Sequence, residues 1–201
     1  AINAKAIPGG QILVAKDKKV VFHEAYGLQS YFDTVKVEKT DLYDLASISK
    51  ISSALPAVMK LHGEGKFDLE AGIGDYLPYF RNSNKADASF REILAHQARF
   101  KPWIPYWQNT LRDNGSFRWF TFQEDSSRRF PVKITDNLWL HRNYQKKIFK
   151  AIKKSPLEDE AKYKYSGLLF YLLPSIVEQI SGEDYQTYIN ENFYEPLGAT
   201  T

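Results

Sequence analysis

Cysteine is absent from this chain of 201 residues, and that absence excludes disulfide bonds, thiolate metal ligands and a cysteine nucleophile. Long apolar runs are also missing, because charged or polar residues interrupt each one before the roughly 18 residues of a membrane-spanning helix. We therefore expect no membrane span. Neither positive nor negative charge dominates, since the chain has 27 Lys and Arg and 24 Asp and Glu, mixed along most of its length. That balance argues against a nucleic-acid-binding protein.

Metal-ligand spacing is the next feature that the sequence lacks. The histidines at positions 23, 62, 96 and 141 form no H-x-x-x-H pair or similar pattern. We expect them to have core or surface roles, and we expect neither a metal ion nor another cofactor. The sequence begins at Ala1 without a basic and then apolar leader, so we expect no signal peptide within it. The length predicts one domain over residues 1–201.

The first third of the sequence predicts a hairpin followed by a helix. Residues 11–15 and 20–26 are apolar runs separated by a charged turn, the pattern of two antiparallel strands. Residues 42–45 predict a short strand leading to Ser47, and helical spacing of apolar residues begins there. Pro56 lies inside this helix, where it removes a backbone donor, so we expect a kink.

The remaining sequence predicts a largely helical region. Residues 67–107 resemble short helical pieces broken by glycine and proline, and residues at about 108–137 lack periodicity, so we expect an insertion there. A helix over 140–152 has an apolar stripe and a basic face that we interpret as solvated. Residues 168–180 predict one deeply buried helix capped by Ser166, and a further helix covers 185–193. The basic face consists of Arg142, Lys146, Lys147, Lys150 and Lys153.

Ser47 and Lys50 have the spacing of a nucleophile and its activating base. Residues three apart lie on one helical face, so the Lys50 amine can reach the Ser47 hydroxyl. A serine at a helix N-terminus also has free backbone N–H groups that can stabilise an oxyanion. Lysine normally titrates near 10.4, so action as a base needs a shift of roughly three units, or about 4 kcal/mol. A second polar group must therefore assist it.

The segment DLASISK at 44–50 resembles the S-x-x-K motif of serine β-lactamases and penicillin-binding proteins. More specifically, the chain is similar to the group of class C β-lactamases, D-alanyl-D-alanine carboxypeptidases and esterases, and segments 9–27, 94–97 and 165–198 follow in that family's order. The resemblance implies an α+β, β-lactamase-like fold with an N-terminal hairpin and a helical region. The family's final K-T-G or H-x-G strand has no counterpart here, which implies an incomplete domain lacking the C-terminal sheet strands.

The resemblance also implies a third site residue, Tyr165, because Tyr165-Ser166 matches the start of the family's Y-x-N or Y-S-D motif. We expect Tyr165 to relay protons. Two positions depart from the family: Gly167 replaces the Asn or Asp of that motif, and Arg99 replaces the glycine of H-x-S-G-L. Arginine adopts a positive φ less readily than glycine, so we expect that loop to have changed shape.

The implied function is that of an extracytoplasmic or periplasmic serine hydrolase that forms an acyl-enzyme on Ser47. Its substrate would be a β-lactam, a peptidoglycan stem peptide or an ester, and the full-length protein would have to supply the missing strands. The alternative is a catalytically degenerate binding or accessory module of a larger cell-envelope enzyme, as Gly167 and Arg99 suggest. The sequence leaves the substrate and the oligomeric state open.

Overall fold

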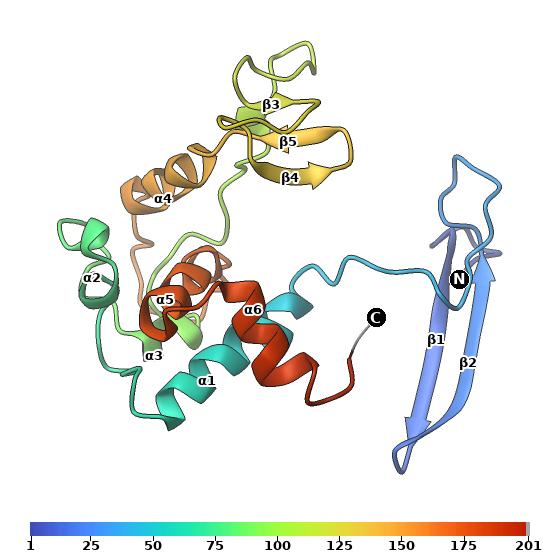
Figure 1. The fold of residues 1–201 in the computed structure, drawn as a ribbon, viewed down its shortest axis with the longest axis horizontal. Helices are drawn as coiled ribbons and strands as arrows, with labels where there is room; N and C mark the ends of the chain where they lie inside the picture. The colour runs from blue at the N-terminus through green and yellow to red at the C-terminus, as the bar shows by residue number, and fades with distance from the viewer. Residues whose placement is uncertain (200–201) are drawn as a thin grey trace. The chain divides into compact units, whose positions relative to one another are not determined.

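The computed structural model describes residues 1–199, and its elements are shown along the chain in Figure 1. The chain separates into two compact units, residues 1–46 and the residues from Ser47 onward, and we describe each unit by itself. The expectation of a single domain with an insertion at about 108–137 stays a prediction.

The first unit is built on an antiparallel hairpin of β1 (Gly9–Lys16) and β2 (Lys19–Gly27). The two connecting residues, Asp17 and Lys18, have φ values of 51° and 63°. Positive φ at both central positions is the geometry of a type I′ turn, whose twist matches that of the paired strands. The predicted hairpin is confirmed.

The hairpin leaves apolar side chains exposed on both of its faces, and residues 42–45 do not extend it. These residues form no strand, so that prediction is wrong. A strand needs a partner for its backbone groups, and the only ladder in the first unit joins β1 to β2. Leu42 is accordingly 86% exposed. The exposed apolar side chains of the hairpin include Ile12, Leu13, Val14, Val20, Val21 and Phe22.

The second unit is mostly helical. It begins with a π-helical turn, η1 (Lys50–Ala54), which continues directly into α1 (Leu55–Gly63). Nine further helical elements follow along residues 64–199. They are α2 (Ile73–Tyr76), η2 (Pro78–Phe80), α3 (Phe90–Leu94), η3 (Gln108–Thr110), α4 (Tyr144–Lys154), η4 (Leu169–Tyr171), α5 (Leu173–Ser181), α6 (Tyr185–Ile189) and η5 (Asn190–Tyr194).

The single buried helix predicted over 168–180 is two elements, η4 and α5, separated at Leu172. Pro174 explains the break, because it has no backbone N–H and is tolerated in the first turn of a helix but not in its interior. The burial was predicted correctly, since Leu173, Ile176 and Val177 are fully buried. Gly182 ends α5 in the left-handed conformation, with φ of 78°.

Residues 122–140 form a small antiparallel sheet in the order β3, β5, β4. Its strands are β3 (Phe122–Gln123), β4 (Val132–Thr135) and β5 (Leu138–Leu140). Leu140 was predicted to start a helix, but it pairs with Phe122 and Val132 in this sheet, and the helix starts at Tyr144.

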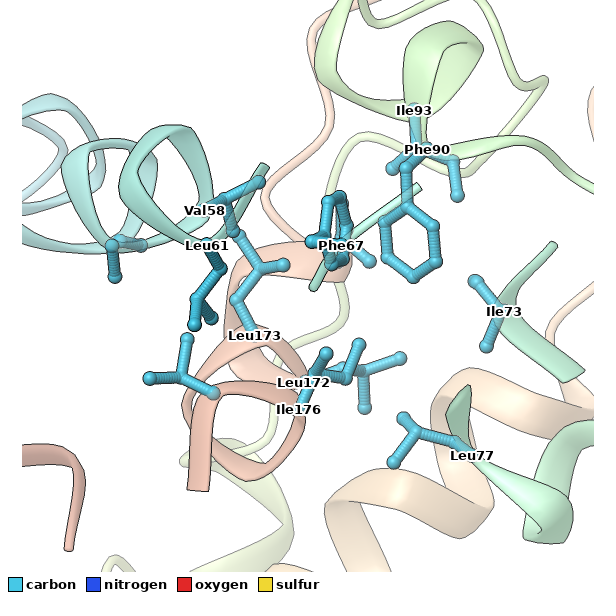
Figure 2. Packing of buried hydrophobic residues seen from close by; sticks show 14 of the residues in the cluster. Val58, Leu61, Phe67, Ile73, Leu77, Phe90, Ile93, Leu172, Leu173 and Ile176 are labelled. Carbon is cyan, nitrogen blue, oxygen red and sulfur yellow. The ribbon is translucent and has the colours of Figure 1, made fainter. Parts of the chain in front are cut away.

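The core of the second unit joins α1, α5 and the aromatic residues between them. Figure 2 shows Val58 and Leu61 of α1 facing Leu173 and Ile176 of α5, with Phe67 and Phe90 beside them. The rings of Phe67 and Phe90 meet edge to face, with centroids 4.8 Å apart. Close packing of these side chains holds the start of α1, and hence the segment of Ser47, against the rest of the unit.

Lys85 is a charged residue inside this unit, with no solvent exposure. Its Nζ donates hydrogen bonds to the carbonyl of Ser155 at 2.5 Å and to the Oδ1 of Asn84 at 2.9 Å. It also lies 5.7 Å from the centre of the Phe100 ring. Burial lowers the pKa of Lys85 to about 8. The ammonium group therefore links the loop before α3 to the end of α4.

None of the helices within residues 1–199 is both long enough and apolar enough to cross a membrane.

Candidate active site

Ser47 lies in the turn that immediately precedes the first helical residue, Ile48. The N–H of Lys50 donates to the carbonyl of Ser47 at 3.1 Å and closes this first turn. The side chains meet as well, because the Nζ of Lys50 donates a hydrogen bond to the Oγ of Ser47 at 3.0 Å. Ser47 is exposed and Lys50 is half-buried, so the hydroxyl is accessible while the amine is partly covered.

The interruption expected at Pro56 takes the form of the π-helical turn η1. The N–H of Leu55 donates to the carbonyl of Lys50, five residues earlier instead of four. Pro56 cannot donate to the carbonyl of Ser52, four residues before it, and the hydroxyl of Tyr194 donates to that carbonyl at 3.2 Å instead. The end of the chain's last described helix thus supports the turn that holds Lys50.

Tyr165 comes from a distant segment and meets the same pair. The Nζ of Lys50 lies 5.7 Å from the centre of the Tyr165 ring and 5.6 Å from that of Phe170. A hydrogen bond with the Ser47 hydroxyl lowers the pKa of the Tyr165 phenol, burial opposes this, and a hydrogen bond with Lys50 and its charge lower the pKa further. The structure therefore brings together all three residues that the sequence singled out.

Gly167 lies beside Lys50. A Cβ built on Gly167 would lie 3.5 Å from the Cε of Lys50 and 3.9 Å from its Nζ, which is ordinary van der Waals contact. The N–H of Gly167 donates to the carbonyl of Pro102 at 3.1 Å. The position has room for a small side chain next to the lysine, but glycine supplies no polar group there.

His96 holds the Tyr165 segment on both sides of the tyrosine. Its carbonyl accepts from the N–H of Lys164 at 2.9 Å, and its Nδ1 accepts from the N–H of Ser166 at 3.2 Å. Its ring lies 4.6 Å from that of Tyr165, centre to centre. Burial lowers the pKa of His96, and the charge of Lys50 acts in the same direction. The neutral imidazole is thus favoured, with Nδ1 free to accept.

His96 was expected to have only a core or surface role, and its contact with Tyr165 was not predicted. Its position in the 94–97 segment was the available signal. In the loop that follows His96, Arg99 adopts a φ of 62°. The N–H of Glu158 donates to the carbonyl of Arg99 at 2.7 Å, and the Nε of Arg99 donates to the backbone carbonyl of Glu158 at 2.6 Å. These two bonds offset the strain of the left-handed backbone, and the expected change in the shape of this loop stays a prediction.

Ser166 was expected to cap the buried helix, but the N-caps of η4 and α5 are Leu168 and Leu172, and neither element has a side-chain cap hydrogen bond, so that prediction is wrong. The Oγ of Ser166 instead accepts from the N–H of Leu168 at 3.3 Å, just before η4. The same hydroxyl donates to the carbonyl of Lys101 at 2.6 Å. Among residues 1–199, no group of three or more His, Asp or Glu side chains is arranged to hold a metal ion.

Comparison with known proteins identifies the family. The model of the family described as Beta-lactamase matches residues 1–201, and the chain therefore belongs to that family. The "Putative D-alanyl-D-alanine carboxypeptidase" of Escherichia coli K12 is 28% identical over 96% of this chain and 42% of its own length. Protein flp of Staphylococcus aureus strain COL is 24% identical over 96% of this chain and 34% of its own length. The chain spans less than half of these relatives.

Two solved structures show the same fold. The octameric penicillin-binding protein homologue from Pyrococcus abyssi superimposes with a TM-score of 0.70 and 21% identity, covering 99% of this chain and 41% of that protein. The class C β-lactamase from Rhodobacter sphaeroides gives a TM-score of 0.62 and 20% identity, covering 98% and 46%. The predicted β-lactamase-like α+β fold is therefore confirmed.

Proposed function

We infer that this chain contains the nucleophile half of a serine acyl-transfer hydrolase, with Ser47 as nucleophile and Lys50 and Tyr165 as its proton-transfer partners. The observation that supports this most directly is the 3.0 Å hydrogen bond from the Nζ of Lys50 to the Oγ of Ser47, with Tyr165 against the same pair. Tyr165 is more than a hundred positions from Ser47 in sequence. Packing alone would not require three reactive side chains from two distant segments to meet at one exposed point.

The chemistry follows from the geometry. The Oγ of Ser47 forms a bond to the carbonyl carbon of the substrate, and the bond from that carbon to the leaving group breaks. Tyr165 acts in its phenolate form: its oxygen takes the serine proton as the new bond forms and passes that proton to the leaving group, so the tyrosine ends the step as a phenolate again. Lys50 stabilises the negative charge of this phenolate, in line with its effect on the Tyr165 pKa.

The substrate class that we infer is an activated acyl group: a β-lactam, a D-alanyl peptide of the peptidoglycan type, or an ester. Kinship with a protein described as a D-alanyl-D-alanine carboxypeptidase supports this choice and an extracytoplasmic location. No cofactor enters the proposed reaction. The family resemblance implies that the complete enzyme would use a K-T-G or H-x-G strand for the oxyanion and for substrate docking, and the chain spans 42% of that relative.

One observation favours the second candidate, a catalytically degenerate binding or accessory module of a larger cell-envelope enzyme. Gly167 places no amide or carboxylate beside Lys50, so part of the polar support for the lysine is missing. In this case the fold would be retained while acylation is lost.

Covalent labelling distinguishes the two candidates. The chain is incubated with a fluorophosphonate or a fluorescent penicillin, and intact mass spectrometry measures a stoichiometric adduct even when acylation takes hours. We expect one adduct that disappears in Ser47→Ala and maps to the peptide containing Ser47. An adduct that persists in Ser47→Ala, or no adduct on the folded full-length protein, would refute the nucleophile and favour the degenerate module.

A further inference from the structure

The positive charge of this chain is concentrated in one segment, which the near balance of the whole sequence conceals. Residues 108–154 contain 11 Lys and Arg but only 4 Asp and Glu, a net charge of +7. The whole chain has a net charge of +3, so the remaining residues together have a net charge of −4. An asymmetry of this size predicts an anionic partner for the segment.

The segment folds as one contiguous region of the second unit, made of the small β-sheet and α4. The N–H of His141, just before α4, donates to the carbonyl of Thr121 at 3.0 Å. The N–H of Arg142 donates to the carbonyl of Arg129 at 3.0 Å. In Figure 1 the β-sheet and α4 follow one another at the same end of this unit. The basic residues of the sheet and of the helix therefore lie on neighbouring elements of one region.

The cations of this region are largely free of carboxylates. Among residues 1–199, Lys133 is the only lysine or arginine of this segment within 4 Å of a carboxylate oxygen, that of Asp136. On α4 the apolar face is packed into the core through Tyr144 and Ile152, which are 7% and 0% exposed. Its other face exposes four lysines, namely Lys146, Lys147, Lys150 and Lys154.

The same segment also has exposed aromatic side chains. Phe117, Trp119 and Phe120 are 50%, 77% and 68% exposed. Phe120 directly precedes Thr121, and the carbonyl of Thr121 accepts from the N–H of His141, just before α4. The backbone of Phe120 therefore lies near the start of α4. The guanidinium of Arg112 lies 5.5 Å from the centre of the Trp119 ring. We call Phe117, Trp119, Phe120 and the basic residues of 108–154 the basic–aromatic surface.

We propose that the basic–aromatic surface binds the headgroup region of an anionic lipid bilayer and attaches the protein to it peripherally. Lys and Arg side chains are attracted to the negative surface of such a bilayer, each contributing roughly fivefold to binding. Trp and Phe side chains favour the interface between headgroups and acyl chains, which removes their exposed apolar area from water. A soluble polyanion would satisfy the charges but would leave Trp119 and Phe120 in water, so the aromatic residues favour a lipid surface. The proposal does not depend on the proposed function of Ser47.

Vesicle sedimentation tests this proposal. The chain is mixed with vesicles of phosphatidylcholine alone or with about a third phosphatidylglycerol, at low salt and in 0.5 M NaCl. The variant Lys146→Gln/Lys147→Gln/Lys150→Gln/Lys154→Gln removes four charges from α4, and Lys16→Gln/Lys18→Gln/Lys19→Gln/Lys36→Gln removes four from exposed positions of the first unit. A third variant, Trp119→Ala/Phe120→Ala, tests the aromatic contribution. Circular dichroism verifies that each variant is folded.

We expect binding to the anionic vesicles only, lost in 0.5 M NaCl and weakened at least tenfold by the α4 variant. The control variant of equal net charge should bind within about twofold of the parent, and the aromatic variant should bind at least fivefold more weakly. Equal losses in the α4 and control variants would reduce the effect to net charge and overturn the proposal. Binding to heparin beads without binding to vesicles, or full binding by the aromatic variant, would show a soluble polyanion as the partner and overturn it too.

Discussion

Replacing Lys85 by methionine should change how the stability of this protein depends on pH. Burial lowers the pKa of Lys85 from 10.5 to about 8, so the folded protein binds the proton less tightly than the unfolded chain. Above pH 10.5 both states are neutral at this position and the group has no effect. As the pH falls from 10.5 to 8, the unfolded chain takes up the proton first and stability is lost; below pH 8 the loss is complete.

The magnitude follows from the size of the shift. A change from 10.5 to about 8 corresponds to about 3 kcal/mol of free energy of unfolding, lost below pH 8. Between pH 7 and pH 9.5 the parent protein should regain about 2 kcal/mol of this through Lys85. Lys85→Met removes the buried charge but also the hydrogen bond to Ser155, whose loss costs about 1 to 3 kcal/mol. The two effects nearly cancel at pH 7, so the variant should be close to the parent in stability there.

Urea unfolding of the parent and of Lys85→Met at pH 7 and pH 9.5 tests this reasoning. All other groups titrate equally in both proteins and drop out of the difference. We expect the difference in unfolding free energy to move by about 2 kcal/mol in favour of the parent at pH 9.5. The matched control, Lys150→Met at an exposed position, should show no such movement. A difference for Lys85→Met that stays constant within about 0.5 kcal/mol would refute the lowered pKa.

Three further predictions concern the site. Tyr165→Phe should slow covalent labelling of the nucleophile by about 100-fold or more with little change in thermal stability, since Tyr165 is 44% exposed; an unchanged rate would remove it from the reaction. Gly167→Asn should speed labelling, because the added amide would lie beside Lys50, whereas Gly167→Ala should not; equal rates in both variants would contradict this. Tyr194→Phe should lower the free energy of unfolding by about 1 kcal/mol in urea, because the Ser52 carbonyl loses its donor; no loss would mean that water replaces the hydroxyl.

Local sequence signals predicted those parts of the fold that depend on neighbouring residues. The charged residues between two apolar runs predicted the hairpin, and the spacing of Ser47 and Lys50 predicted their contact on one helical turn. Helical periodicity also located the buried residues of α5. Tyr165 was a different case, because its approach to Ser47 followed from resemblance to a family and not from any local pattern.

The failures arose where a distant partner decides the local structure. Residues 42–45 have the composition of a strand, but a strand forms only with a ladder partner, which the sequence around them does not reveal. Arg99 also depends on a distant partner, because hydrogen bonds with Glu158, 59 residues away, stabilise its positive φ, although no prediction failed there. The periodic leucines around Pro174 predicted one continuous helix, but the missing N–H of Pro174 divides that run into two elements.

The π-helical turn at Lys50–Ala54 also matters for how this chain is aligned with its relatives. A π-helical turn contains one more residue than an α-helical turn, since its hydrogen bond joins residues five positions apart instead of four. Each residue of a helix turns the chain by about 100°. Deleting one residue from this segment would therefore rotate Ser47 away from its present direction although every residue of α1 and the side chains of Ser47 and Tyr165 were retained. A relative whose sequence has a one-residue gap opposite residues 50–54 would therefore direct the serine aligned with Ser47 differently. A motif search that looks only for S-x-x-K cannot detect this difference.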